Sequence, residues 1–313
     1  MNTIKNIFIV LLCLSAVSCS REIAISPGVE DFQVTTDKTV YRVNEEVMFH
    51  FEGNPDMISF YSGELYNDYA YREARIIDLQ NTIVNFTSQH PVLAGSQESE
   101  FAILVSTDFN NTYSYDNLIN ATWHDITDKF TLGTAGTFVT SGNYEISELY
   151  EIGKPLFFAF RYRSLPQEQH GVVRRRLIEN VQFLAESIYE THTLGNMTTS
   201  DFRIVEKNEN AITASLLSAT RITLNGYERT LGSDDPDPDT ETWVVSKAFD
   251  LDQIDNGPDR AVGLKGNQDP LLVNHTHAFS RAGEYTVTFI GTNANIHDIQ
   301  QVVRQVKITV EDD

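Results

Sequence analysis

Hydrophobic residues in this chain alternate with polar ones over short stretches, which is the pattern of half-buried β-strands. In Tyr285-Thr286-Val287-Thr288-Phe289, the three apolar side chains would share one face of a strand and the two threonines the other. Similar alternation predicts strands within 41–51 and 306–310. Strands without intervening helices favour an all-β protein built of antiparallel sandwiches.

The middle of the chain contains apolar runs of strand length. They are Glu100–Ser106, Pro155–Tyr162, Asp201–Val205, Ala219–Leu224 and Thr242–Ser246. Pro155–Tyr162 is the most apolar of them. It would place Phe158 and Phe160 on one face and Phe157 and Ala159 on the other, so we expect both faces of its sheet to be covered.

Two stretches at opposite ends of the chain resemble the two halves of one known domain. Residues 277–289 resemble the closing hairpin of the polycystic-kidney-disease (PKD) type Ig-like domain, H-T-Y-x-x-A-G-x-Y-T-V-T-L. Tyr41–Phe51 resembles the earlier pattern Y-x-V-G-E-x-V-x-F-x-F, with Asn44 where glycine is usual. Asparagine tolerates the left-handed conformation that the glycine would supply.

The PKD resemblance implies one Ig-like sandwich assembled from residues 31–66 and 270–313 and split by an insertion at 67–269. These two end segments are long enough together for one small sandwich. The alternative is that they are two unrelated edge segments.

A second resemblance lies within the insertion. It is carried by the runs Leu104–Phe109, Ala121–Thr127, Lys154–Tyr162 and Arg175–Phe183. They resemble the series S-T-D-Y, A-x-W-x-D-I/L-T, I-A-F-x-Y and x-I-D-N-V-x-F of galactose-binding-like and choice-of-anchor jelly rolls. The resemblance implies that 67–269 forms a jelly-roll sandwich. Residues 174–189 also show helical spacing, but within this series we expect Leu177–Phe183 to be a strand.

Residues 1–18 form a targeting segment, with Lys5 in its charged region and an apolar stretch at 7–17. Its end, Ala16-Val17-Ser18-Cys19, resembles the lipobox of bacterial lipoproteins, which implies cleavage before Cys19 and acylation of its thiol. The alternative is an ordinary secretory signal. Cleavage would leave Cys19 as the one cysteine of the mature chain, so no internal disulfide can form. Residues 19–30 are predicted to be a tether.

Charge and motifs narrow the function classes. The 44 acidic residues against 23 Lys and Arg give a net charge of −21, which disfavours nucleic acid as a partner. The sequence contains no G-x-S-x-G, H-E-x-x-H, P-loop or G-x-G-x-x-G motif. A catalytic cysteine is excluded because Cys19 is the proposed lipid site. We therefore expect a protein that is not an enzyme.

Aromatic side chains are the candidates for binding a ligand, since sugars stack their C–H faces on aromatic rings. The candidates are Tyr113, Tyr115, Trp123 and Trp243. Both tyrosines flank an Asn-rich loop and are expected to be exposed. Both tryptophans are expected to belong to the core.

The same loop offers oxygen ligands at the short spacing typical of calcium loops. They belong to Asp108, Asn110 and Asp116. Since jelly rolls of the resembled class often hold a structural calcium, Ca²⁺ is the one cofactor that the sequence suggests. The alternative is a polar loop whose side chains cap turns.

Taken whole, the chain resembles Bacteroidetes-type surface lipoproteins that carry a domain of unknown function. Their build is similar to that of the surface glycan-binding proteins of polysaccharide-utilisation systems. The resemblance implies lipid anchoring in the outer membrane, on either its surface or its periplasmic side, and polysaccharide capture for an outer-membrane importer complex. The alternatives are an adhesin that binds a protein surface and a glycan hydrolase.

We predict that replacing Cys19 with alanine releases soluble protein, because the acyl chains that hold the mature chain to the membrane are lost. Fractionating cells that express wild type and Cys19→Ala checks this. A variant that sediments with membranes as the wild type does would show that Cys19 is not the anchor.

Overall fold

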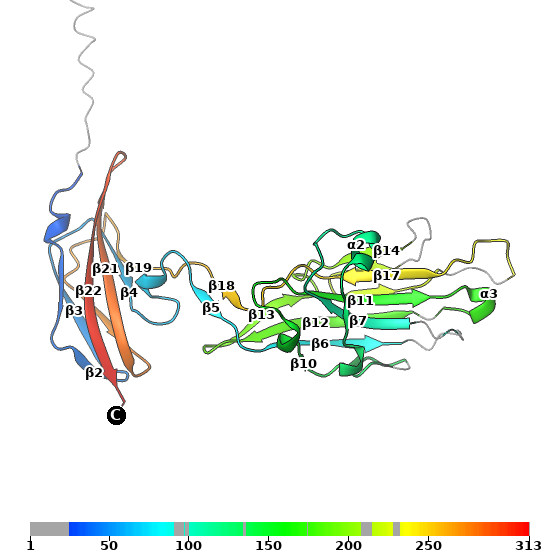
Figure 1. Cartoon of the computed structure of the whole chain (residues 1–313). Helices are drawn as coiled ribbons and strands as arrows, with labels where there is room; N and C mark the ends of the chain where they lie inside the picture. Colours follow the sequence, from blue (N-terminus) through cyan, green and yellow to red (C-terminus); the bar gives the residue numbers. More distant parts are fainter. Residues whose placement is uncertain are drawn as a thin grey trace, which may run out of the picture. The chain divides into compact units, whose positions relative to one another are not determined.

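The computed structural model describes residues 25–90, 97, 100–133, 136–173, 175–207, 215–227 and 232–312. Cys19 and the targeting segment lie outside them. The regular structure of the described chain is mostly β-strand, with only short helical segments, as predicted (Figure 1). It divides into two compact units: a first unit up to Arg75 and from Gly257 onward, and a second unit of Ile76–Asn256. Residues 67–75 and 257–269, which the sequence patterns assign to the insertion, therefore belong to the first unit.

The first unit contains two sheets. One has the order β1 (Gln33–Thr36), β3 (Glu46–Glu52), β20 (Asn274–Ala278). The other has the order β19 (Val262–Lys265), β4 (Met57–Tyr61), β21 (Gly283–Ala294), β22 (Ile299–Glu311), β2 (Val40–Arg42). Two 3₁₀ turns, η1 (Val29–Asp31) and η2 (Tyr69–Tyr71), complete the unit.

Strands from the two ends of the chain pair with each other in both sheets. Strand β20 lies antiparallel to β3, β21 antiparallel to β4, and β22 parallel to β2. This confirms the predicted sandwich assembled from both chain ends. Asn44 has φ of 63°, the left-handed conformation expected of it. The buried core residues are Phe32, Tyr41, Val47, Phe49, Phe51, Ile58, Phe60, Phe279, Val287, Phe289, Ile308 and Val310.

The second unit contains two larger sheets and a short ribbon. The first sheet has the order β10 (Tyr144–Glu145), β6 (Thr82–Gln89), β12 (Arg176–Glu186), β16 (Arg221–Leu224), β15 (Leu216–Leu217), with β13 (Thr191–Asn196) on β12 and β9 (Val139–Thr140) on β6. The second has the order β14 (Arg203–Glu206), β17 (Thr240–Val245), β11 (Phe157–Ser164), β7 (Glu100–Ser106), β8 (His124–Asp125). The ribbon pairs β5 (Ile76–Asp78) with β18 (Gln253–Asp255). Short helical segments are α2 (Tyr115–Asn120), η3 (Thr127–Lys129), η4 (Ser147–Leu149) and α3 (Gln167–His170).

The main core of the second unit lies between its two sheets. It includes Val84 and Phe86 of β6, Val181 and Phe183 of β12, and Ile103, Phe158, Phe160 and Val244 of the facing sheet. Leu177–Phe183 is part of strand β12, so the strand prediction is confirmed and the helical alternative is wrong. Phe157 and Ala159 point away from this core and are also buried, so both faces of β11 are covered as expected.

A buried ion pair holds together the two chain segments at which the first unit is interrupted. The Nε and Nη2 atoms of Arg75 donate to the two carboxylate oxygens of Asp259 at 2.8 and 2.6 Å. The side chains are only 5% and 2% exposed. Asp259 Oδ2 also accepts the Asp68 N–H at 2.8 Å, and the Arg75 guanidinium lies 3.7 Å from the Tyr71 ring centroid. The arrangement fixes the departing chain against the returning chain.

Burial alone would raise the pKa of Asp259, but the hydrogen bond from Arg75, the Asp68 N–H and the charge of Arg75 together lower it. A carboxyl whose pKa is lower in the folded state stabilises the fold at pH values above its unfolded pKa of about 3.9. That stability is lost as the pH falls through the folded value. The ion pair therefore weakens only in acid, below about pH 4.

We predict that Asp259→Ala lowers the free energy of unfolding of the first unit by about 3–5 kcal/mol, because Arg75 is left buried without its counter-charge. Amide hydrogen exchange in β4 and β21 measures this loss, which should shrink below about pH 4. Both tryptophans of the chain, Trp123 and Trp243, lie in the second unit, so fluorescence-detected unfolding serves as an internal control. Glu73→Ala, which removes the exposed ion pair between Glu73 and Arg72, is the second control. Exchange in Asp259→Ala no faster than in Glu73→Ala would contradict the prediction.

Candidate functional site

The outer face of the sheet that contains β11 is covered by the chain segment between β7 and β8. Phe109 and Leu118 of this segment are buried against Ala102, Leu104, Phe157, Ala159, Val205, Trp243 and Val245. Helix α2 begins after Ser114, whose hydroxyl accepts the Asn117 N–H. The segment forms a second, smaller core and places Tyr113, Tyr115 and Trp123 over the sheet.

Trp123 of this segment packs on Trp243 of β17 in the sheet. Trp123 and Trp243 have ring centroids 5.2 Å apart, and Trp243 is only 3% exposed. The Trp123 indole N–H donates to the Leu118 carbonyl at 2.8 Å. Trp243 therefore belongs to the core, as expected, whereas Trp123 is half-buried and packs against the edge of this core.

Glu241 connects Trp243 to Tyr115. Its Oε1 accepts the Trp243 indole N–H at 2.8 Å, and its Oε2 accepts the Tyr115 hydroxyl at 3.2 Å. Burial, together with the nearby negative charge of Glu241 and this hydrogen bond, raises the pKa of Tyr115. The tyrosine is therefore a neutral hydrogen-bond donor fixed in one orientation.

An open pocket of about 550 Å³ lies beside Tyr115. Its lining residues come from the start of α2 and from β14 and its end: Tyr113, Ser114, Tyr115, Asp116, Ile204, Val205, Glu206 and Lys207. The pocket brings together three of the residues singled out from the sequence, Tyr113, Tyr115 and Asp116. It combines aromatic rings, an aliphatic side and charged groups.

Both tyrosines are half-buried against the smaller core rather than exposed as expected, and they are not equivalent. The Tyr113 ring packs edge-on against Phe109, and the Arg203 guanidinium lies 4.5 Å from its centroid. Its hydroxyl donates to the Ser246 carbonyl at 2.9 Å. In the described part of the chain, no other ring or cation stacks on Tyr115. Tyr115 is therefore the ring better placed to stack on a ligand.

The charged groups around the pocket are held by neighbours. Lys207 donates to Asp239 at 2.7 Å, and Glu206 accepts the Thr242 hydroxyl at 2.6 Å. Asp116 is exposed at the rim. The carboxylates of Asp116 and Glu206 outnumber the one cation of the lining, Lys207.

The residues predicted to bind calcium have separate positions in this layer. Asp108 Oδ1 accepts the Thr122 N–H at 2.8 Å and the Ser106 hydroxyl at 2.9 Å. Asn110 Oδ1 accepts the Thr112 N–H at 2.9 Å, as in a capped turn, whereas Asp116 lines the pocket. Among the described residues there is no group of three or more His, Cys, Asp or Glu side chains arranged to hold a metal ion. Calcium binding stays a prediction.

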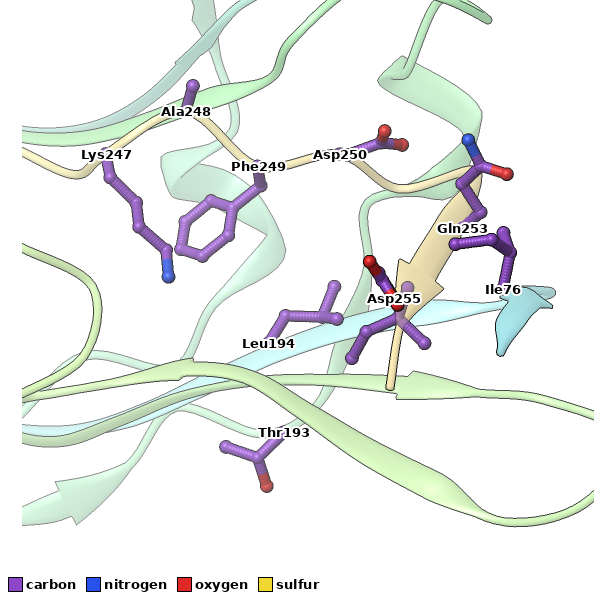
Figure 2. Close-up of a pocket in the computed structure, with 10 residues that line it drawn as sticks. Ile76, Thr193, Leu194, Lys247, Ala248, Phe249, Asp250, Gln253 and Asp255 are labelled. Atoms are coloured by element: carbon purple, nitrogen blue, oxygen red, sulfur yellow. The ribbon is translucent and has the colours of Figure 1, made fainter. Parts of the chain in front are cut away.

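A second hollow of about 420 Å³ lies elsewhere in the second unit, between the segment 247–255 and β13. Figure 2 shows Lys247 and Phe249 reaching from one segment toward Leu194, while Thr193 points to the far side of β13. Phe249 is only 3% exposed, so its ring belongs to the core. This hollow contains none of the residues singled out from the sequence and offers no exposed aromatic ring.

Comparison with known proteins identifies a family for the chain. The family model described as "Domain of unknown function (DUF5017)" matches residues 18–209, more than half of the 313 residues. The chain belongs to this family. The DUF5017 match includes β1–β4 of the first unit and, from the second, both sides of the pocket beside Tyr115.

No curated protein and no solved structure matches the chain. In the residues that the structure describes, no helix is long and apolar enough to cross a membrane. The family assignment therefore supplies a relationship without an activity, and the pocket must be interpreted from its own chemistry.

Sequence reasoning identified one side of the pocket and missed the other. Ile204–Lys207 and Glu241 were not singled out, because roughly ninety residues separate the two sides along the chain. Only the sheet order β14-β17-β11-β7 places β14 beside the segment that follows β7. A weak signal for Glu241 exists, since it directly precedes the predicted strand 242–246.

We predict that Glu241→Ala lowers the free energy of unfolding of the second unit by about 2–3 kcal/mol, because the Tyr115 hydroxyl and the Trp243 indole N–H lose a charged acceptor. Urea unfolding followed by tryptophan fluorescence measures the change, since Trp243 belongs to the smaller core and Trp123 packs against it. Glu148→Ala, at an exposed position, is the control. Equal stability of the two variants would show that Glu241 does not hold the layer together.

Proposed function

We propose that this protein is a non-catalytic, lipid-anchored protein of the outer membrane that captures extracellular polysaccharide for an importer. The observation that carries the proposal is the pocket beside Tyr115. A pyranose ring presents an apolar C–H face and a rim of hydroxyls. In this pocket the Tyr115 ring can stack on the C–H face, and Asp116, Glu206 and Lys207 can form hydrogen bonds with the hydroxyls.

The proposal favours binding over hydrolysis. Hydrolysis requires two carboxyl groups on either side of a bound glycosidic bond. Of the carboxylates nearest Tyr115, Glu241 accepts hydrogen bonds from Tyr115 and Trp243, and Glu206 accepts one from Thr242. These contacts support a binding role for the carboxylates.

The charges of the pocket also indicate which polysaccharides it suits. Asp116 and Glu206 carry negative charge, and the one cation of the lining, Lys207, is paired with Asp239. The chain as a whole has a net charge of −21. Neutral polysaccharides fit these surroundings, whereas sulfated or uronic-acid polymers would be repelled.

Anchoring and location rest on the sequence. The lipobox-like Ala16-Val17-Ser18-Cys19 supports acylation of Cys19, and the resemblance to Bacteroidetes-type surface lipoproteins supports the outer membrane and an importer as partner. An anchored binder next to an importer would raise the local concentration of polysaccharide by tethering it.

We predict that Tyr115→Ala weakens binding of a neutral polysaccharide about tenfold, the equivalent of about 1–2 kcal/mol of stacking. Tyr115→Phe, which keeps the ring, should bind nearly as the wild type does. Tyr189→Ala is the matched control, because Tyr189 is 48% exposed in the same unit but does not line the pocket. Affinity electrophoresis in gels that contain the polysaccharide measures these changes.

Three outcomes would contradict the proposal. Equal retardation of Tyr115→Ala and Tyr189→Ala would remove the pocket as the site. Release of reducing ends by the wild type would make the protein a hydrolase. A glycan array without hits, together with tight binding to a protein surface, would make it an adhesin.

A further inference from the structure

The hairpin of β21 and β22 extends past its partner strands and ends in exposed isoleucines. The last residue of β21 that pairs with β4 is Thr292, and β2 pairs with β22 only at Thr309–Glu311. In the described residues, Asn293–Gln300 thus has no third strand beside it. Ile296 is 78% and Ile299 64% exposed. We call Asn295–Ile299 the hairpin tip.

The tip is an ordered turn. The Asn295 N–H donates to the Asp298 carbonyl, and the Asn295 side-chain oxygen accepts the N–H groups of His297 and Asp298, each at 2.8 Å. Asp298 Oδ1 accepts the Ile299 N–H at 2.9 Å. The turn therefore holds its two isoleucines out in a fixed geometry. Isolated exposed apolar residues are ordinary, so the neighbourhood of the tip decides what covers them.

The N-terminal end of the described chain lies along this hairpin and leads toward the tip (Figure 1). Arg304 donates to the carbonyls of Phe32 and Glu30 at 2.7 and 2.8 Å, and Asn293 donates to the carbonyl of Ser26 at 2.7 Å. Arg304 lies opposite Phe289, and Asn293 lies nearer the tip, opposite Gln300. The chain from 32 back to 26 therefore runs toward the tip.

Packing also holds residues 26–32 against the hairpin in this direction. Val29 is buried, and a Cβ on Gly291 would come within 2.9 Å of the Phe32 ring, so the absence of a side chain there leaves room for the N-terminal segment. Residues 26–30, expected to be part of the tether, are thus held on the first unit. The predicted tether of 19–30 is therefore wrong for residues 26–30.

Acylation of Cys19 would keep a bilayer near the tip. Six residues lie between Cys19 and Ser26. The seven Cα–Cα steps that join the two residues span at most about 25 Å when fully extended. Asn293, whose side chain donates to the Ser26 carbonyl, lies two residues before the tip, and three residues along the chain carry Ile296 at most about 10 Å beyond it. Any bilayer that holds acyl chains on Cys19 therefore lies within a short distance of the exposed isoleucines.

We propose that the hairpin tip is a membrane-contact site, at which Ile296 and Ile299 enter the interfacial region of the bilayer that holds the lipid anchor. This inference rests on the acylation of Cys19 proposed above. The tip is suited to contact with a bilayer because the carboxylate of Asp298, the one acidic side chain in it, accepts the Ile299 N–H. Two exposed aliphatic side chains add apolar contact to the acyl anchor and fix the orientation of the first unit.

The test uses the mature acylated chain on phosphatidylcholine vesicles, with and without brominated acyl chains. Acylation blocks the thiol of Cys19, so an environment-sensitive fluorophore on Ile296→Cys labels a single position. The matched control carries the label on Val40→Cys, which is 44% exposed and pairs with Thr309 at the opposite end of β22. The label at 296 should lose most of its fluorescence in brominated vesicles and resist quenching by iodide. The label at 40 should keep its fluorescence in brominated vesicles and be quenched by iodide.

A further pair of variants tests whether Ile299 contributes to the contact. Adding Ile299→Asn to the chain labelled at 296 should open the label to iodide, whereas Gln301→Asn should not. Vesicle-bound protein whose two labels are equally open to iodide would overturn the membrane contact and leave the anchor intact. If the wild-type protein does not float with the vesicles, it has no lipid anchor. That result would overturn both the anchor and the contact that depends on it.

Discussion

A chain that leaves a β-sandwich incomplete and later returns to finish it must hold its departing and returning segments side by side. The Arg75–Asp259 pair does this at the edge of the first unit, where both side chains are almost fully buried and both carboxylate oxygens are used. Beyond it, Ile76 pairs with Asp255, so the second unit also begins and ends on paired strands. The entropic cost of closing a loop rises only slowly with its length. Once these two ends are fixed, a whole domain can therefore be inserted with little loss of stability in the first unit.

In the second unit, the decisive constraint is a sheet that is buried on both faces. The main core occupies one face, and the other would expose Phe157, Ala159 and Trp243 unless another layer covered it. The segment from Thr107 to Trp123 provides that layer, and Glu241 connects it to the sheet. The proposed glycan pocket lies where this layer meets β14. Because the segment must cover the sheet, it is packed firmly, and Tyr113 and Tyr115 at its edge line the pocket in a fixed geometry.

Period-two alternation predicted strands of the first unit such as β21, and apolar runs of strand length predicted β7 and β11 of the second. The spacing of 174–189 also fitted a helix, and the jelly-roll resemblance decided for the strand that became β12. The pairing of the chain ends followed from the PKD resemblance, since no local pattern reports a partner strand more than two hundred residues away. The sequence also placed Tyr115 and Asp116 in one loop, but it could not show that Arg203 covers the Tyr113 ring or that β14 forms the opposite wall. Those contacts depend on sheet order, which side-chain periodicity does not encode. Residues 26–30 differ from the expected tether because their carbonyls find donors in Asn293 and Arg304.

The central claim is that this DUF5017 protein holds polysaccharide in the pocket between the start of α2 and β14. The most direct measurement is amide hydrogen exchange of the full chain with and without the polysaccharide that retards it in affinity gels. The account predicts slower exchange confined to Tyr113–Asn120 and Arg203–Lys207, with the first unit unchanged. Slower exchange elsewhere with no change in these two segments would contradict it.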